Sequence, residues 1–588
     1  MGLTRRAMLA GAGAGALAGR ARAATDPAAA NAVGGPAPRG PSPAIGVRIL
    51  HITDTHAQAA PVRFREPAAN IGVGAARGRP PHLVGEAFLQ DFHLAPGTSA
   101  AHAFTFLDFE RLAHRYGPLG GFAHLKTLID ALRAEAGPGR SLLVDGGDLT
   151  QGSGLANLTR GQDMVALANL LGTEVMTGHW EFTYGEAGLR ALLAAYKGSF
   201  VAQNVFLTDE AAFANAPAFD AASGRVFPPY VIRELGGHPI AVIGQAFPYV
   251  PIAHPKRLTP DWTFGIHPHK LQAVVDEVRG KHKVDAVLLL SHNGMDVDLA
   301  LAARVRGIDV ILGGHTHDAV PVPQVVGNPG GRTFVTNAGT AGKFVAVLDL
   351  SLARGRLVDL RYRLLPVFAE QHRADPAMAA AIAHWRAPHA AMLGEELAEV
   401  GPLLYRRGNF TGSMDQVICD ALRTELDAEI VLSPGFRWGN SFLPGHKLTM
   451  EDLLSETAIT YPSVYVQTMT GAALKGAMED VCDNLFNRNP FYQQGGDMVR
   501  LGGMDYACAP REKIGNRISA MTLNDGTAIE ASKSYKVAGW ASVSLPQDRE
   551  PVWDVVARHL RRNRHIVIPR PNRVKLIGVA GNPGYAAT

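Results

Sequence analysis

Cysteine is scarce in this chain of 588 residues, which has only three, at Cys419, Cys482 and Cys508. Three thiols are too few for a disulfide framework or a cysteine metal site to organise the fold. Cys482 and Cys508 can either form a bridge in an oxidising compartment or remain buried free thiols. Any metal site is therefore expected to use nitrogen and oxygen ligands.

A large charge of one sign is also missing. The formal net charge is +4, and the first 23 residues supply four arginines, at positions 5, 6, 20 and 22, with no acidic residue. The rest of the chain is therefore close to neutral. It has no basic run interleaved with aromatic residues, so nucleic-acid binding is not indicated.

Long apolar runs are the third absence. The Gly/Ala-rich stretch that ends at Ala18 is shorter than the ~20 residues needed to span a bilayer, and no later segment is long and apolar enough. Instead, Arg5-Arg6, this stretch and Ala21-Arg22-Ala23 together predict a twin-arginine export signal with its cleavage site. We therefore expect residues 1–23 to direct the protein to the periplasm without a membrane anchor. Residues 24–44, rich in Ala, Pro and Gly, are expected to form a flexible linker.

The remaining sequence has the composition of a soluble globular protein, with 47% hydrophobic and 19% charged residues, and its length indicates at least two domains. Apolar runs of strand length occupy residues 47–52, 142–144, 284–290 and 308–312. Continuous apolar strands are typical of a sheet covered on both faces. Because helical patterns at 122–132 and 271–278 lie between them, we predict an α/β first domain over residues 45–366.

The pattern changes after Leu364. Asp375-Pro376 is a favourable N-cap and first-turn pair, and the Ala-rich stretch to Leu393 predicts a linking helix within residues 367–394. A C-terminal domain is expected over residues 395–580, with helices at 415–426 and 471–482 and strands at 428–432, 463–468 and 535–541. Residues 60–117 show few clear elements and are expected to form an irregular insertion over the first domain.

Potential metal ligands follow the apolar strands, at the edge where open α/β sheets place their sites. Seven carboxylate and imidazole groups occupy five such loops: Asp54, His56, Asp148, His179, His292, His315 and His317. One Asp or His in a loop usually caps a turn or is solvated, but five such loops together indicate a dinuclear metal centre. Neighbouring glycines would let the backbone approach closely at tight turns: Gly146, Gly147, Gly178, Gly313 and Gly314.

This ligand set suits Mn, Fe, Co or Zn. A carboxylate that bridges two ions about 3.5 to 4 Å apart lowers the pKa of a shared water and stabilises charge on the attacking and leaving atoms. No Gly-x-Ser-x-Gly elbow or activated-cysteine pattern competes with such a site. The sequence therefore predicts a metal-dependent hydrolase.

Four short motifs resemble those of the calcineurin-like metallophosphoesterases. They are Asp54-Thr55-His56, Gly146-Gly147-Asp148, Ser291-His292-Asn293 and Gly314-His315-Thr316-His317. With Gly435-Phe436-Arg437 in the second domain, the chain is similar to the 5'-nucleotidase family over about residues 45–580. The resemblance implies an N-terminal α/β/β/α sandwich and a C-terminal α/β domain of the nucleotidase type.

One motif departs from the nucleotidases. Where they usually carry Gly-Asn-His-Glu-Phe-Asp, this chain has Gly178-His179-Trp180-Glu181-Phe182-Thr183. The family's metal-binding Asn is thus His179, and its catalytic His and partner Asp are Trp180 and Thr183. Together with the segments 434–439 (PGFRWG) and 492–500 (YQQGGDMVR), this variant resembles the SoxB family, the thiosulfohydrolases of periplasmic sulfur oxidation.

The SoxB resemblance implies a di-manganese enzyme that releases sulfate from a thiosulfonate on a cysteine of the SoxYZ carrier, by attack of a hydroxide held by two metal ions. It assigns the ligands by motif position: Asp54, His56 and His317 to one ion, His179, His292 and His315 to the other, and Asp148 to both. We expect a monomer that binds neither nucleic acid nor membrane.

Arg437 matches the nucleotidase arginine that reaches the substrate's oxyanion, so we expect Asp148 and Arg437 to be catalytic. Arg407 and Trp180 are weaker substrate-binding candidates, because the pair Arg406-Arg407 can equally be a solvated surface and Trp180 can simply be packing.

Two alternatives remain open at this stage. The first is a periplasmic 5'-nucleotidase or related phosphoesterase, and the second is a metal-dependent binding protein. A persulfide-type sulfur leaves at low pKa and needs little protonation, so a thiosulfohydrolase tolerates loss of the His/Asp dyad. Paired aromatic rings that stack on a base would favour a nucleotide, whereas a narrow channel would favour the cysteine arm of a carrier.

Overall fold

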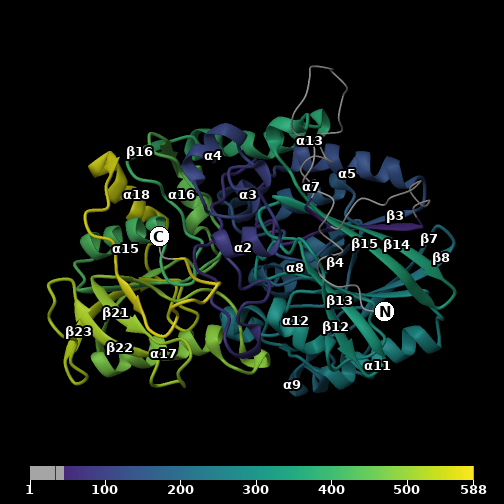
Figure 1. Cartoon of the computed structure of the whole chain (residues 1–588). Helices are drawn as coiled ribbons and strands as arrows, with labels where there is room; N and C mark the ends of the chain where they lie inside the picture. Colours follow the sequence, from purple (N-terminus) through teal and green to yellow (C-terminus); the bar gives the residue numbers. More distant parts are fainter. Residues whose placement is uncertain (1–32, 35–45, 587–588) are drawn as a thin grey trace.

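A computed structural model describes residues 33–34 and 46–586 of the chain (Figure 1). The predicted signal peptide, and the predicted linker except Val33–Gly34, lie outside the described residues. The N-terminal domain, at the right of Figure 1, and the C-terminal domain, in green to yellow at the left, lie side by side.

The first domain contains two main sheets. One has seven strands, in the order β1 (Val33–Gly34), β15 (Arg356–Pro366), β14 (Phe344–Ala353), β2 (Val47–Ile52), β3 (Ser141–Asp145), β4 (Val175–Met176) and β5 (Ser199–Phe200). The other has six, in the order β12 (Gln324–Asn328), β13 (Gly331–Asn337), β11 (Val310–Gly313), β10 (Ala286–Ser291), β8 (His238–Gln245) and β7 (Tyr230–Leu235). Strands β2 to β5 are parallel, as are β8, β10, β11 and β13.

Alternate residues of each central strand face opposite layers, which explains the continuous apolar runs. Val47 and Ile49 of β2 belong to the core between the two sheets, together with Leu288 of β10. Leu50 of β2 instead packs under helices of one outer layer, and Leu289 of β10 packs under the other. The resulting α/β/β/α sandwich confirms the predicted fold class.

Helices cover the outer faces of both sheets (Figure 1). Those in contact with the core of the first sheet include α5 (Phe122–Ala136), α6 (Gly154–Thr159), α7 (Gln162–Leu171), α8 (Gly185–Ala195) and α13 (Pro376–Arg386). Those on the second sheet are α11 (Pro268–Gly280) and α12 (Met295–Ala302). Smaller elements complete the domain: β6 (Val205–Leu207), β9 (Trp262–Phe264), α9 (Asp209–Phe213) and α10 (Val250–Ala253).

The predicted linking helix is wrong as a single element. Asp375 caps α13 as expected, because its side chain accepts the backbone N–H of Met378. The helix nevertheless ends at Arg386, and a 3₁₀ turn over Ala387–His389 separates it from α14 (Ala390–Leu393). Pro388 in that turn has no N–H for an α-helical hydrogen bond, which accounts for the break.

The C-terminal domain contains three small sheets and four helices among its described residues. Their strand orders are β19 (Val464–Thr470), β23 (Ser534–Trp540), β17 (Ile430–Ser433), β20 (Arg500–Gly502); β18 (Lys447–Thr449), β16 (Glu396–Val400), β24 (His565–Ile566); and β22 (Ile518–Leu523), β21 (Met504–Cys508), β25 (Val574–Leu576). The helices are α15 (Ser413–Glu425), α16 (Met450–Thr457), α17 (Gly471–Phe486) and α18 (Val552–Asn563). Cys482 and Cys508 are buried free thiols with their sulfur atoms 3.6 Å apart.

The segment 60–117 differs from the irregular insertion that the sequence suggests. It forms three short helices, α2 (Gly85–Asp91), α3 (Ser99–Phe104) and α4 (Phe109–Tyr116), which lie between the two domains in Figure 1. The backbone N–H of Arg65 donates to the Ser441 hydroxyl, and Phe109 packs against Leu443. This segment therefore joins the two domains instead of covering only the first.

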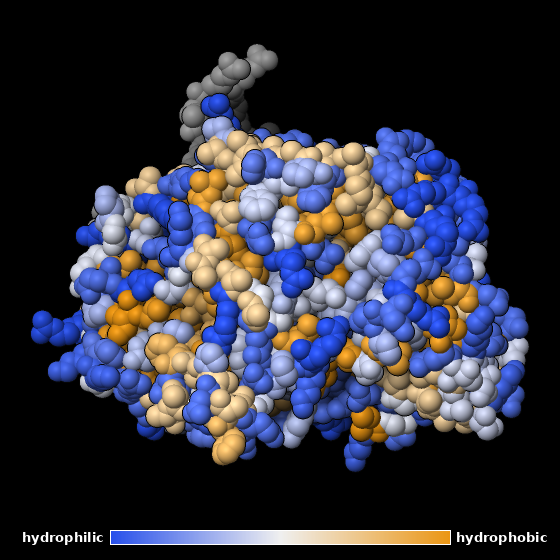
Figure 2. All heavy atoms as spheres, turned by 180° about the vertical axis from the view of Figure 1, so that it is seen from behind, coloured by the Kyte–Doolittle hydropathy of each residue, from blue (hydrophilic) through white to orange (hydrophobic). Residues whose placement is uncertain are grey.

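No helix within residues 33–34 and 46–586 is long and apolar enough to cross a membrane. On the face shown in Figure 2, apolar residues lie in separate patches bordered by hydrophilic ones.

Candidate metal centre

The seven candidate ligands meet at the carboxyl ends of five strands, β2, β3, β4, β10 and β11. They form two groups, within each of which the ligand atoms all lie within 4.8 Å of one another: Asp54, His56, Asp148 and His317, and Asp148, His179, His292 and His315. All seven residues are buried. Asp148 is the one residue common to both groups.

The distances around Asp148 place it between the groups. Its Oδ2 atom lies 3.1 Å from His292 Nε2, 3.2 Å from His179 Nδ1 and 3.4 Å from His56 Nε2. His56 Nε2 in turn lies 3.0 Å from His317 Nε2. Buried nitrogen and oxygen lone pairs that converge in this way on both sides of one carboxylate suit two divalent cations.

The backbone at these residues is strained. Asp54, His56, Asp148, His315 and His317 have φ angles between 45° and 73°, in the left-handed region. That region costs a non-glycine residue roughly 1–2 kcal/mol. Five of the seven candidate ligands adopt this strained conformation. Such clustering is typical of a functional site, where the surrounding fold holds side chains in fixed directions.

Four of the five predicted glycines are required by the geometry. Gly147 has a φ of 99°, and a Cβ there would lie 3.0 Å from His292 Nδ1. A Cβ on Gly314 would lie 2.9 Å from Asp54 Oδ2. Only Gly147 of the five has a positive φ, but close approach also requires glycine at two further positions: a Cβ on Gly146 would collide with the Thr53 side chain, and a Cβ on Gly313 would lie 2.8 Å from Asp298 Oδ2.

Glu181, which the sequence reasoning did not single out, anchors two of the ligand loops. Its buried carboxylate accepts the backbone N–H groups of His179 at 2.8 Å and of Leu149 at 2.7 Å, with longer bonds from Asp148 and Thr150. Burial raises the pKa of Glu181, and the charge of Asp148 adds to that increase. The sequence signal that could have identified Glu181 is its position two residues after His179, inside the motif that differs from that of the nucleotidases.

Burial keeps most of the imidazoles neutral, which leaves a lone pair for a metal. It lowers the pKa of His56 to about 4 and lowers the pKa values of His179, His315 and His317. At His292, burial also lowers the pKa, but the carboxylates of Asp148 and Asp54 outweigh it and raise the value to about 10. These two carboxylates therefore favour positive charge at the centre.

Backbone carbonyls fix which ring nitrogen faces the centre. His292 Nδ1 lies 2.6 Å from the carbonyl oxygen of Gly146, and His315 Nε2 lies 3.0 Å from that of Gln494. Because a carbonyl only accepts, both nitrogens must carry the proton, and the other nitrogen of each ring is the one that would bind a metal. The contact from Gln494 comes from the second domain, so the centre is completed by both domains.

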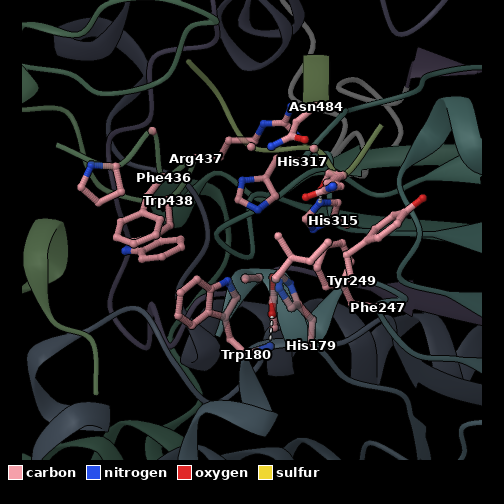
Figure 3. Close-up of a pocket in the computed structure, with 18 of the residues that line it drawn as sticks. His179, Trp180, Phe247, Tyr249, His315, His317, Phe436, Arg437, Trp438 and Asn484 are labelled. Atoms are coloured by element: carbon pink, nitrogen blue, oxygen red, sulfur yellow. Dashed lines mark hydrogen bonds and ion pairs between the residues drawn. The ribbon is translucent and has the colours of Figure 1, made fainter. Parts of the chain in front are cut away.

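A cavity of about 230 Å³ opens over the candidate ligands (Figure 3). Both domains line it, and its lining includes Trp180, Phe247, Tyr249, Phe436, Arg437, Trp438, Asn484, Gln494 and Gly495. A Cβ on Gly495 would collide with the ring of His315, so only glycine fits there. The sequence reasoning missed Phe247, Tyr249 and Asn484, whereas residues 436–438 and 494–495 fall in the segments 434–439 and 492–500 that carried the family resemblance.

Aromatic rings form one wall of this cavity. Phe436 and Trp438 are stacked with their centroids 4.1 Å apart, and Trp180 meets Trp438 edge to face at 4.9 Å. Inserting a base between two rings requires about 7 Å between their planes, twice the usual contact distance. Phe436 and Trp438 therefore leave no slot for a base between them.

Arg437 lies beside the metal ligands with unused donor capacity (Figure 3). Its Nε is 3.4 Å from Asp497 Oδ1, and its buried Nη1 has no hydrogen-bond partner among the described residues. Burial lowers its pKa, and the charge of Asp497 works against that decrease. A guanidinium with free donors at a cavity is suited to an oxyanion.

Arg406 and Arg407 are buried, which corrects the view of them as a solvated pair. Arg406 forms an ion pair with Asp415 at 2.9 Å. Arg407 donates to the carbonyl of Thr316 at 3.1 Å and does not line the cavity over the metal ligands. Thr183 is also away from that lining, and its hydroxyl lies 2.6 Å from that of Thr460.

Comparison with known proteins agrees with this geometry. The calcineurin-like phosphoesterase family model matches residues 47–319, and the 5'-nucleotidase C-terminal domain model matches residues 404–548. The 5'-nucleotidase of Rattus norvegicus is 28% identical over 327 residues, 52% of this chain and 54% of that enzyme. The chain thus matches about half the length of this curated relative.

Two solved structures extend the comparison over both domains. The sulfate thiohydrolase SoxB of Thermus thermophilus, in complex with glycerol, is 35% identical, with a TM-score of 0.84 and coverage of 92% of this chain and 98% of that one. The 5'-nucleotidase precursor of the same species is 21% identical, with a TM-score of 0.70 and coverage of 90% and 99%. The second match shows a common fold, and the first adds similarity in sequence.

Proposed function

Because this chain belongs to the SoxB family, within the 5'-nucleotidase and calcineurin-like metallophosphoesterase superfamily, we propose that it is a thiosulfohydrolase. Its substrate would be an S-thiosulfonate on a cysteine of a carrier protein, and its products sulfate and a cysteine persulfide. The observation that carries the proposal is the site around Trp180. The indole of Trp180 occupies the position of the nucleotidase histidine. It packs against Trp438, which is stacked on Phe436 with no room for a base between the two rings.

We propose separate roles for the metal ligands and for Arg437. Asp54, His56 and His317 would hold one ion, His179, His292 and His315 the other, and Asp148 both. Two divalent ions, which we propose to be Mn²⁺, would acidify a water molecule and offset negative charge. Arg437, which lines the cavity, would hold the sulfonate oxygens, because a guanidinium fork matches oxyanion geometry.

The bond changes explain why no general acid is needed. The oxygen of water attacks the sulfonate sulfur, the bond to the neighbouring sulfur breaks, the electron pair stays on the cysteine persulfide, and the two protons of the water pass to solvent. A persulfide is a good leaving group at neutral pH, so its departure requires little proton transfer. Trp180, Phe436 and Trp438 would exclude bulk water from the reacting sulfur atoms.

The partner we propose is the SoxYZ carrier, whose thiosulfonate-bearing cysteine arm would enter the cavity between the two domains. A cavity of about 230 Å³ that both domains line fits a short extended arm better than a whole nucleotide with its base. We further propose that the enzyme acts as a monomer.

Restoring the nucleotidase dyad is expected to restore phosphatase activity. The double variant Trp180→His, Thr183→Asp should raise phosphate release relative to sulfate release by at least about ten-fold, since positioned acid–base groups contribute roughly 10² to 10⁴-fold. Initial rates on a nucleoside monophosphate and on an S-thiosulfonate cysteine peptide measure the ratio. The matched control, Trp180→Phe with Thr183→Asn, also replaces the indole by a smaller ring but supplies no dyad, and it should not change the ratio in favour of phosphate. An equal gain in that control would mean that space alone limits phosphatase activity.

We also propose that the protein reaches the periplasm folded, by the twin-arginine route, with its ions already bound. Replacing Arg5 and Arg6 by lysine should leave the precursor in the cytoplasm, as measured by cell fractionation. The control Arg20→Lys, Arg22→Lys makes the same chemical change outside the twin pair and should be exported normally. Normal export of the first variant would rule out this route.

A further inference from the structure

A second cavity, of about 270 Å³, contains none of the seven candidate metal ligands in its lining. Three parts of the chain line it: residues 65–69, 405–411 and 572–586. Three of its lining residues are arginines, Arg65, Arg407 and Arg573, and none is acidic. The side chains that line this cavity therefore include positive charges and no negative one.

Arg65 is held in place without a counter-ion. It is 7% exposed, and its guanidinium carbon lies 4.1 Å from the centre of the Tyr405 ring and 4.8 Å from that of Phe106. Within the described part of the chain, no acidic group forms an ion pair with it. Stacking fixes the plane of a guanidinium and leaves the N–H groups at its edge available for an oxyanion.

Arg407 lies between two carboxylates. It is 3% exposed, its Nη1 lies 3.4 Å from Asp497 Oδ1 and its Nη2 lies 3.8 Å from Asp318 Oδ1, while its buried Nε has no partner among the residues that the structure describes. Asp497 also pairs with Arg437 and Arg500, so its single charge is divided among three guanidinium groups. Arg573 is exposed at the same cavity, and the hydrogen bond that it donates to Asp505 comes from its backbone N–H.

We propose that this second cavity binds a small tetrahedral dianion of the sulfate type. Clusters of surface arginines are usually solvated, but Arg65 is more than nine-tenths buried and forms no ion pair among the described residues, and an uncompensated charge in such a place is costly. A dianion offsets more of that charge than a monocarboxylate does. The binding chemistry is independent of the proposed function; only the identity of the ligand as the reaction product depends on it.

The test is binding of inorganic sulfate to the full-length, metal-loaded protein by equilibrium dialysis, with no substrate present. In an Arg437→Ala background, which weakens anion binding over the metal centre, one sulfate should still bind. Adding Arg573→Gln should weaken that binding at least about ten-fold, the usual effect of losing one charge-assisted contact. Arg511→Gln, which removes an exposed arginine outside the cavity, is the matched control and should leave binding unchanged.

Competing anions define the ligand class. The phosphate dianion should displace sulfate, whereas acetate at equal ionic strength should not displace it. This pair of results would show that tetrahedral geometry and charge determine binding. Equal affinities for the Arg573→Gln and Arg511→Gln proteins, loss of all binding in Arg437→Ala, or displacement by acetate would each overturn the proposal. The binding test measures no hydrolysis. Its result can therefore be interpreted even if the proposed thiosulfohydrolase function is wrong.

Discussion

Replacing Asp148 with alanine is expected to lower hydrolysis by at least about 10³-fold and to leave fewer than one metal ion per chain, because a bridging carboxylate serves both ions. The geometry behind this expectation is the position of Asp148 Oδ2, which lies within 3.4 Å of imidazole nitrogens from both ligand groups. Turnover of the thiosulfonate peptide and metal content by elemental analysis measure the two effects.

The matched control for this variant is Asp163→Ala. Asp163 is an equally buried aspartate on α7 that accepts a hydrogen bond from Thr159 and belongs to neither ligand group. It should retain both ions. Two full equivalents of metal in the Asp148→Ala protein would disprove the bridging assignment.

Replacing Arg437 with alanine should reduce kcat/KM for sulfate release by about 10²-fold, since loss of a charged donor to an oxyanion costs roughly 3 kcal/mol. Asp497 would keep its pairs with Arg407 and Arg500, so the fold and both metal ions should be retained. Arg437→Lys keeps the charge without the fork and should recover only part of the activity.

Two outcomes would contradict this role for Arg437. A loss of metal in the alanine variant would make it a structural support for the centre. Full recovery by lysine would mean that charge alone matters. Phosphate release from nucleotides should fall in parallel, because either substrate presents an oxyanion to the same group.

The candidate ligands were predictable because they depend on local sequence. Each follows a short apolar run, and parallel strands bring their carboxyl ends to one edge of a sheet, so residues as far apart as 54 and 317 meet. The α/β/β/α layers were predictable for the same reason, since continuous apolar strands need a cover on both faces. The strand limits shifted by only one or two residues: β10 begins at Ala286 and β11 at Val310.

What the sequence could not reveal depends on contacts between distant segments. Arg406 looks like half of a surface pair until Asp415 and the carbonyl of Glu456 close around it. The carbonyl of Gln494 orients His315 through the backbone, which carries no side-chain signal at all. The sequence of residues 60–117 looks irregular because its helices are too short to show a repeating pattern of apolar residues. These helices are stabilised by packing between the two domains.

The most direct test of the account compares two reactions of one metal-loaded preparation: sulfate release from an S-thiosulfonate cysteine peptide and phosphate release from nucleoside monophosphates. With Trp180 and Thr183 in place of an acid–base dyad, the thiosulfonate should be hydrolysed well and the nucleotides poorly, with both ions bound throughout. Faster hydrolysis of a nucleotide than of the thiosulfonate would contradict the account and make the protein a periplasmic nucleotidase.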